Sequence, residues 1–309
     1  MKTFVGPTWE TLAIFEKPVR GKNLSFVEIP HFQPEGVEEK VRAQWEKQVD
    51  DKLVELRAKG IAVEKRPYAE DAGKNPLSAL YEGAKAKMWP GSAITLHDFS
   101  EKKTGIELHV SQTSFPAIKA LSDPDIIESY RLAHAPLPRP ALAVCTFART
   151  QDDYLALTVR GPKTNMYPGR LYGQGGNPTD TKKTVVEHQL DEMASEISVG
   201  EKQVRPSSFT FFGIVVDNDQ LKRKPDLVGI VDVRRDTWRL KEQMRKRTSF
   251  EPDAIDVLFA PVDPGGLHDY LVMRTHPSWF CPAAHGGLAL IGRAFYGDGW
   301  LNDVLKDMK

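Results

Sequence analysis

The sequence predicts an α/β protein whose larger part is a mixed sheet with helices on both sides. Runs rich in Val, Ile, Phe and Thr, such as residues 207–217 and 226–233, have the length and composition of strands. They alternate with stretches whose apolar residues recur every three or four positions, which is the period of an amphipathic helix. Strands that alternate with helices in this way are typical of an α/β domain.

A proline-rich stretch divides the chain of 309 residues into two parts. Between residues 133 and 142 prolines stand at alternate positions, which forces an extended backbone that cannot be helical. The sequence before this stretch is mixed and rich in charge, whereas strand-like runs follow it. We therefore expect a smaller α/β N-terminal domain over residues 1–135 and a larger domain over residues 136–309.

Local patterns give the order of the elements. Apolar residues from Val37 to Leu56 recur at steps of three and four, which predicts a helix, and Gly60 is a typical residue at its C-terminus. The other elements expected in the first part are strands over residues 25–32, 93–99 and 105–113 and short helices over residues 115–123 and 125–132. Those expected in the second part are strands over residues 141–149, 153–160, 207–217, 226–233 and 256–262 and helices after Asp180, around residues 238–246 and after Pro282.

Composition and charge narrow the classes of function. Lys and Arg number 42, as do Asp and Glu, and the resulting net charge of +0 argues against binding a nucleic-acid backbone by bulk electrostatics. The basic run at residues 234–247 is then interpreted as a solvated helix face. Two isolated cysteines, the lack of a long apolar run and a charged N-terminus lead us to expect a cytoplasmic protein without a disulfide framework, signal peptide or membrane span.

The stretch YGQGGNPTDTKKTVVEHQLDEMASEISV, residues 172–199, combines a pair of glycines, a polar loop and a helix. Thr179 or Asp180 is expected to cap the helix. Its expected buried stripe consists of Val186, Leu190, Met193 and Ile197. Glu192 and Glu196 lie one turn apart on a neighbouring face and can hold a hard divalent cation, although such a pair in isolation is usually a solvated face.

This loop and helix resemble the signature box of the Nudix hydrolases. In that box a glycine, five residues, a glutamate and seven residues precede REUxEExGU, where U is a bulky aliphatic residue. Residues 191–199 fall on REUxEExGU, with Glu192 on the first metal-binding glutamate and Glu196 on the last. The departures from the box are Lys183 at the upstream glutamate, Asp191 at the arginine, Ser195 at the middle glutamate, Ser198 at the second glycine and Asn177 at the first.

The flanking sequence is similar to the animal Nudix-motif-22 UDP-glucose diphosphatases, a branch of the family with a degenerate box and an added N-terminal domain. The similarity lies in LHVSQTSFPAIKAL at residues 108–121, in Trp45–Glu46, and in CPAAHGGLALIGR at residues 281–293. It implies a Nudix-type α/β/α sandwich with a mixed sheet, preceded by the smaller α/β domain.

The resemblance also implies an activity, namely hydrolysis of a small nucleoside diphosphate-linked substrate. A nucleotide sugar such as UDP-glucose, giving UMP and glucose 1-phosphate, is the first candidate. Mg²⁺ is the implied cofactor, with Mn²⁺ possible, and Glu192 and Glu196 are the implied ligands, either of them able to act as the base. The expected substrate-binding residues are Arg160, Arg170, Gly175 and Gly176. No nucleic acid or membrane is expected as a partner.

Alternatives stay open beside this hypothesis. The altered residues Lys183, Asp191 and Ser195 are compatible with a Nudix-fold protein that binds a nucleotide and has lost catalysis. The substrate is alternatively a prenyl or dinucleotide diphosphate. A third alternative pairs Cys281 with His285 as nucleophile and base, but no partner that orients the base is apparent. A structural role is favoured over a direct one for Tyr167, Tyr172, His188 and the polar loop at residues 217–226.

Overall fold

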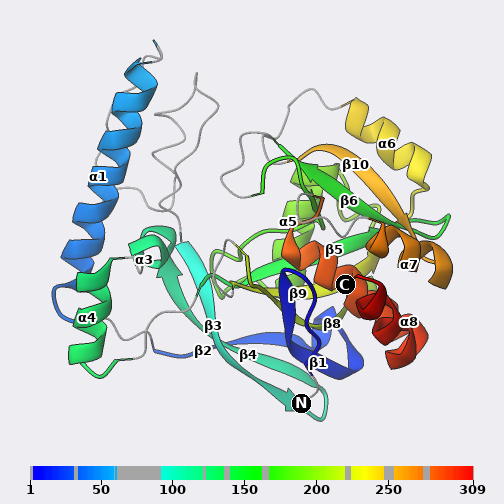
Figure 1. Cartoon of the computed structure of the whole chain (residues 1–309), viewed down its shortest axis with the longest axis horizontal. Helices are drawn as coiled ribbons and strands as arrows, with labels where there is room; N and C mark the ends of the chain where they lie inside the picture. The colour runs from blue at the N-terminus through cyan, green and yellow to red at the C-terminus, as the bar shows by residue number, and fades with distance from the viewer. Residues whose placement is uncertain are drawn as a thin grey trace.

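The computed structural model shows a large and a small sheet, each covered by helices (Figure 1). It describes residues 3–30, 34–58, 60, 92–120, 123–135, 140–161, 167–219, 224–246, 254–273 and 279–308. Lys222 and Arg223 of the predicted polar loop lie outside the described residues. None of the helices in the described part is both long enough and apolar enough to span a membrane.

The large sheet has seven strands in the order β1-β8-β9-β5-β6-β10, with β7 paired to β6. Their bounds are β1 (Trp9–Arg20), β5 (Ala143–Arg149), β6 (Tyr154–Arg160), β7 (Leu171–Tyr172), β8 (Thr210–Asp217), β9 (Lys224–Asp232) and β10 (Ala254–Pro261). Strands β5 and β9 are parallel, and the other pairs are antiparallel, so the sheet is mixed. The prediction of a mixed sheet is confirmed.

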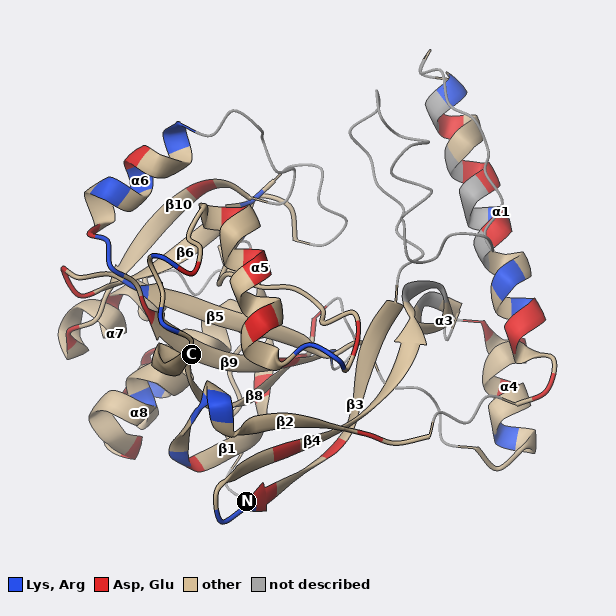
Figure 2. Ribbon diagram, turned by 180° about the vertical axis from the view of Figure 1, so that it is seen from behind, with Lys and Arg blue, Asp and Glu red and all other residues tan. Residues whose placement is uncertain are grey.

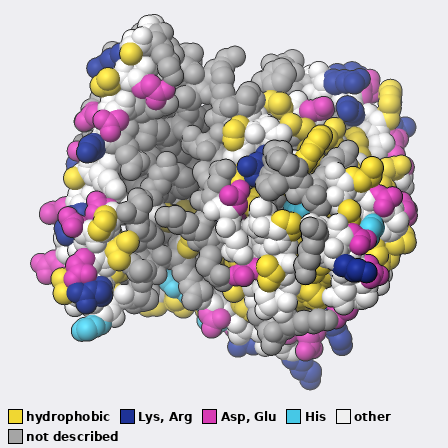
Figure 3. Space-filling view, viewed as in Figure 1, with side chains coloured by type: hydrophobic (Ala, Val, Ile, Leu, Met, Phe, Trp, Pro, Cys, Tyr) yellow, Lys and Arg dark blue, Asp and Glu magenta, His cyan; other side chains and the backbone are white. Residues whose placement is uncertain are grey.

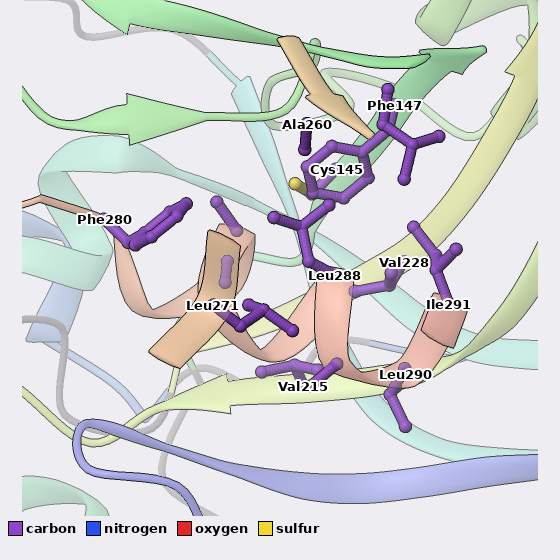
Figure 4. Packing of buried hydrophobic residues seen from close by; sticks show 14 of the residues in the cluster. Cys145, Phe147, Val215, Val228, Ala260, Leu271, Phe280, Leu288, Leu290 and Ile291 are labelled. Carbon is purple, nitrogen blue, oxygen red and sulfur yellow. The ribbon is translucent and has the colours of Figure 1, made fainter. Parts of the chain in front are cut away.

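Helices cover both faces of this sheet because its strands alternate between two apolar cores. Cys145 and Phe147 of β5 join the core under helices α7 (Pro264–Val272) and α8 (Pro282–Asp307), as Figure 4 shows. Val144 and Ala148 of the same strand join the core under helix α5 (Val185–Ile197). Helix α6 (Thr237–Arg245) also packs on the α5 side through Leu240 and Met244. The predicted α/β class with helices on both sides is therefore confirmed.

The small sheet has the order β2-β4-β3 and lies beside α5. Its strands are β2 (Leu24–Glu28), β3 (Ser92–Lys102) and β4 (Gly105–Ser114), with β2 parallel and β3 antiparallel to β4. Leu96, Leu108 and Val110 on one face of it belong to the same core as α5. This shared core attaches the small sheet to the part of the molecule that carries the candidate site.

Three helices form a separate packing group next to the small sheet. These are α1 (Val37–Ala58), α3 (Phe115–Ala120) and α4 (Pro124–Leu132), which bury Val37, Val41, Ala120, Ile126 and Tyr130 together. The end of α1 follows the prediction, since Gly60 has a φ of +75° and its N–H donates to the carbonyl of Arg57. The described residues also include two short 3₁₀ turns, Gly21–Asn23 and Pro206–Ser208.

The sequence reasoning missed strand β1 and helix α7. Strand β1 lies before residue 135, yet it pairs with β8 at the edge of the large sheet. The expectation that residues 1–135 fold apart from the large sheet is therefore wrong for β1, whereas the boundary near residue 135 itself stays a prediction. Trp9, Thr11, Ala13 and Phe15 are buried at alternate positions, the period-2 pattern that marked this strand.

Acidic and basic side chains are interspersed on the face shown in Figure 3, and residues of both kinds are also distributed along the ribbon seen from behind in Figure 2. Helix α6 illustrates this balance, because Arg239 pairs with Asp236 at 3.6 Å and Lys246 with Glu242 at 2.7 Å. This arrangement agrees with the interpretation of the basic run as a solvated helix face.

We predict that replacing Trp9 with Ala lowers the free energy of unfolding by about 3–5 kcal/mol, because its indole is fully buried under α8 and leaves a cavity. Urea denaturation followed by circular dichroism measures the change. Trp238→Ala is the matched control, since Trp238 is 68% exposed, and we expect it to change stability by no more than about 0.5 kcal/mol. Equal effects of the two substitutions would show that β1 is not an integral strand of the large sheet.

Candidate active site on helix α5

Helix α5 begins later than predicted. Its N-cap is Thr184, whose hydroxyl accepts the N–H of Glu187 at 3.2 Å, while the Glu187 carboxylate accepts the N–H of Thr184 at 2.7 Å. The expectation of a cap at Thr179 or Asp180 is wrong, because the Asp180 carboxylate binds the N–H groups of Lys182 and Lys183 within the preceding loop. Glu187 therefore caps the helix, and these bonds lower the pKa of its carboxyl group.

The inward side of α5 carries polar as well as apolar groups. The four residues of the predicted stripe, Val186, Leu190, Met193 and Ile197, are all buried, which confirms that prediction. Gln189 and Glu196 are also buried, with only 1% and 6% of their surfaces exposed. Polar groups at such depth need partners. Their partners identify the segment that completes the site.

That segment is residues 173–176, which run alongside β5 and form an isolated β-bridge with it at Gln174. Thr146 and Gln174 exchange two backbone hydrogen bonds, of 2.9 and 2.7 Å, and the N–H of Val144 donates to the carbonyl of Gly176. Strands β5 and β6 pair directly only through Ala148 and Arg149 with Ala156 and Leu155. Residues 173–176 lie beside the part of β5 that precedes Ala148.

The side chain of Gln174 joins the two strands where they separate. Its Oε1 accepts the N–H of Ala148 at 2.8 Å, and its Nε2 donates to the carbonyl of Ala156 at 3.0 Å. The amide is fully buried, and both of its ends have partners. Gln174 thus fixes the segment to the sheet. The sequence reasoning gave it no role, and a lone glutamine between glycines carried no recognised signal.

The glycines of this segment allow close contact within the protein. A Cβ on Gly175 would lie 1.9 Å from the carbonyl oxygen of Val144, and one on Gly176 would lie 2.5 Å from the Glu192 Oε1. The close atom at Gly175 belongs to the backbone, and Gly175 also has a φ of +148°, so this position requires glycine, whereas at Gly176 the close atom is the end of the Glu192 side chain, which would have to move. The sequence analysis explained these glycines by the approach of a phosphate, and the structure supplies a different reason. Substrate binding by Gly175 and Gly176 stays a prediction.

Helix α5 holds this segment at one peptide group. The carbonyl of Gln174 accepts a bond from the Gln189 Nε2 at 2.7 Å, and the N–H of Gly175 donates to the Glu196 Oε2 at 3.0 Å. Glu192 contacts the next residue, Gly176. The structure thus brings together four of the predicted site residues, Glu192, Glu196, Gly175 and Gly176.

Two departures from the Nudix box compensate each other. Lys183 and Asp191 stand where the box has glutamate and arginine, so the charges at the two positions are exchanged. The Lys183 Nζ lies 2.8 Å from the Asp191 Oδ2, and this contact raises the pKa of the lysine. An ion pair thus links the residue just before α5 to the middle of the helix. These two changes alone give no reason to expect loss of the site.

The two serine departures differ in their consequences. Ser198 has a φ of +57° at the end of α5, a left-handed conformation that glycine adopts more easily. The position therefore requires a left-handed backbone, and the serine adopts that conformation. Ser195 stands where the box has its middle glutamate. Its hydroxyl donates to the carbonyl of Glu192 at 3.0 Å, within the helix. Of the five departures from the box, Ser195 is the one that replaces an expected metal-binding glutamate.

The loop before α5 is held by the small sheet. The Thr181 hydroxyl donates to the Glu28 carboxylate of β2 at 2.7 Å, and Gln112 of β4 reaches the carbonyl of Thr179. His188 lies 2.9 Å from the carbonyl of Asp180 through its Nε2, and its ring meets Phe26 edge-on. These contacts agree with a structural role for His188.

Arg160 and Arg170 are placed on the other side of the sheet. Each guanidinium covers a tyrosine ring, with Arg160 5.3 Å from the centre of Tyr172 and Arg170 4.7 Å from that of Tyr167. Both tyrosines belong to the core under α8. Arg170 also approaches Asp219 at 3.4 Å. The described contacts of these arginines do not include the α5 carboxylates, and their role in substrate binding stays a prediction.

The tyrosines beneath these arginines are bound to buried carboxylates. The Tyr167 hydroxyl donates to Asp217 at 2.5 Å, and the Tyr172 hydroxyl donates to Asp226 at 2.8 Å. Burial raises the pKa of Asp217 and raises that of Tyr172 well above its usual value. Both hydroxyls are thus engaged in the protein interior. These contacts favour the interpretation of Tyr167 and Tyr172 as packing residues.

The Cys281–His285 alternative does not survive the geometry of α8. Burial raises the pKa of the Cys281 thiol to about 12 and lowers that of His285 to about 4. The imidazole also stacks on Phe280 with 4.9 Å between ring centres. Near neutral pH the cysteine is a thiol, and the histidine is too weak a base to ionise it. The pair therefore lacks an activated nucleophile.

The residues around Gly175 and Gly176 fit a divalent cation. The carboxylates of Glu192 and Glu196 each approach this dipeptide, and so does the buried amide oxygen of Gln189, which has no hydrogen-bond partner in the described part of the chain. Oxygen ligands of this kind suit Mg²⁺ and Mn²⁺. Among the described residues, no group of three or more His, Cys, Asp or Glu side chains could hold a metal ion. The carboxylates alone thus fall short of such a group.

Comparison with known proteins gives structural likenesses only. No protein-family profile and no curated protein matches the chain. DR0079 from Deinococcus radiodurans superposes with a TM-score of 0.34 and 15% identity over 50% of this chain and 82% of its own. A MutT protein from Methanosarcina mazei superposes with a TM-score of 0.33 and 13% identity, over 51% of this chain and 97% of its own. A point mutant of the pyrophosphohydrolase BsRppH from Bacillus subtilis superposes with a TM-score of 0.30 and 13% identity, over 53% of this chain and 78% of its own.

We predict that Lys183→Glu lowers the melting temperature, because it places a carboxylate opposite Asp191, and that adding Asp191→Arg restores it. The two substitutions together recreate the charges of the Nudix box. Thermal denaturation at low and at high salt measures the effect, which salt should weaken because both groups are exposed. Lys182→Glu changes the same charge on the neighbouring exposed residue and is the control. A double variant whose melting temperature is no higher than that of Lys183→Glu alone would show that the charges at positions 183 and 191 cannot be exchanged.

Proposed function

We propose that the chain is a divalent-cation-dependent hydrolase of the Nudix type. Its substrate is a nucleoside diphosphate linked to a second group, and a nucleotide sugar such as UDP-glucose is the first candidate. The observation that carries the proposal is the meeting of Glu192 and Glu196 with the Gly175–Gly176 backbone, in the register of the box. The choice of UDP-glucose depends on the flanking sequence resemblance.

Glu192 and Glu196 are the proposed ligands of the cation. A bound Mg²⁺ or Mn²⁺ supplies Lewis-acid chemistry by withdrawing charge from the diphosphate oxygens. The N–H of Gly175 orients the Glu196 carboxylate by its hydrogen bond. One of the two carboxylates accepts a proton from the attacking water. Water attacks one phosphorus in line with the leaving oxygen, and UDP-glucose thereby gives UMP and glucose 1-phosphate.

The proposed contacts to the rest of the substrate are less direct. Gly175 and Gly176 contact the ligands on α5 and are proposed to lie next to the diphosphate. Arg160 and Arg170 have the chemistry for phosphate binding. Their stacking on buried tyrosines favours a packing role, so we place them outside the core of the proposal.

A second candidate function is nucleotide binding without hydrolysis. The observation that favours it is Ser195, which leaves the site with two carboxylates instead of three. Such a protein gains stability from a nucleotide but does not cleave it. A third candidate keeps the hydrolysis and changes the substrate to a prenyl or dinucleotide diphosphate. A panel of diphosphate substrates distinguishes these candidates.

We predict that Glu196→Gln reduces the hydrolysis of UDP-glucose in the presence of Mg²⁺ by about 100-fold or more, because the lost charge weakens cation binding and stabilisation of the transition state. Chromatographic detection of UMP and glucose 1-phosphate measures the rate. Glu201→Gln, on an exposed glutamate just after α5, should retain full activity. Full activity of the Glu196 variant would exclude the proposed site, and a wild-type protein inactive on every nucleotide sugar would exclude the proposed substrate class.

A further inference from the structure

The proposed cation site lacks one charged ligand of the Nudix box. Ser195 replaces the middle glutamate, and its hydroxyl is bound to the carbonyl of Glu192. Glu192 and Glu196 are the carboxylates that remain. A hard divalent cation takes about six oxygen ligands, so any further protein oxygen at this place contributes directly to its binding.

Gln189 offers such an oxygen. Its side chain is 1% exposed, and its Nε2 donates to the carbonyl of Gln174 at 2.7 Å, which fixes which end of the amide is the oxygen. The Oε1 is buried and has no hydrogen-bond partner in the described part of the chain. A buried amide oxygen without a partner is unfavourable, and a bound water or cation would satisfy it.

This oxygen approaches the same dipeptide as the carboxylates. Gln189 and Glu196 are seven residues apart, which places them on the same side of α5 two turns from each other. Both side chains nevertheless reach Gly175, where the Gln189 Oε1 lies 3.1 Å from the Cβ position and the Glu196 Oε2 lies 3.0 Å from the nitrogen. Glu192, between them on the helix, contacts Gly176. Oxygens from three side chains therefore converge on one dipeptide.

We propose that Gln189 supplies its amide oxygen as a third, uncharged ligand of the divalent cation. This inference rests on the cation site of the proposed function and adds to it a ligand outside the REUxEExGU segment. An amide oxygen is a suitable ligand for Mg²⁺ or Mn²⁺. With two carboxylates and one amide, the protein ligands carry two negative charges in place of the three of the full box. Glutamate at position 189 restores the third charge.

Titration with Mn²⁺, followed by electron paramagnetic resonance of the free ion, tests this ligand without reference to activity. We expect Gln189→Leu to weaken Mn²⁺ binding by about 10-fold, because an oxygen ligand is lost. Gln189→Glu should strengthen binding, because a charged oxygen replaces a neutral one. Gln203→Leu is the control, since the Gln203 Oε1 already accepts the N–H of Gly200, and it should bind Mn²⁺ like the wild type.

The two Gln189 variants are expected to change Mn²⁺ affinity in opposite directions, which distinguishes a cation ligand from a residue that only anchors the segment. Both variants lose the donor to Gln174, so a residue that only anchors the segment weakens binding equally in both, and that result would overturn the proposal. Unchanged binding in both would also overturn it, as would a wild-type protein that binds no Mn²⁺. If circular dichroism shows that the leucine variant is unfolded, tighter binding by the glutamate variant supports the ligand and weaker binding refutes it. A wild type that binds Mn²⁺ without cleaving any nucleotide sugar contradicts the proposed function and leaves the ligand assignment standing.

Discussion

The candidate site depends on one peptide group, the one between Gln174 and Gly175. Helix α5 holds its carbonyl through Gln189 and its N–H through Glu196. The side chain of Gln174 fastens the same residue to β5 and β6. Hydrogen bonds are directional, so these four contacts fix the distance and rotation of α5 over the sheet more tightly than apolar packing alone. The carboxylates of α5 are positioned by the same contacts.

The structure shows what the residues that depart from the Nudix box do at their positions. Lys183 and Asp191 form an ion pair, and Ser198 adopts a left-handed backbone at the helix end. These residues thus have structural roles of their own in and next to α5. Ser195 stands where a third carboxylate ligand is expected, and Gln189 is the proposed replacement. The altered sequence is thus compatible with a site that keeps a cation and holds it with less charge.

The sequence predicted the features that depend on local periodicity. The buried stripe of α5 and the order of most strands followed from apolar spacing, and the sequence register brought Glu192 and Glu196 to the glycine pair. The N-cap at Thr184 was missed because several nearby residues have capping side chains, and only the folded loop shows that Asp180 binds its own backbone neighbours. The role of Gln189 could not be predicted, because it arises from contacts with a strand that precedes the helix in the chain.

The most direct test of this account is the location of Mn²⁺ in a crystal of the protein soaked with that ion, measured by anomalous scattering. The account predicts an anomalous peak beside Gly175 and Gly176, within coordination distance of the carboxylates of Glu192 and Glu196. A peak at another place in an intact fold, or the absence of a peak at saturating Mn²⁺, would contradict it.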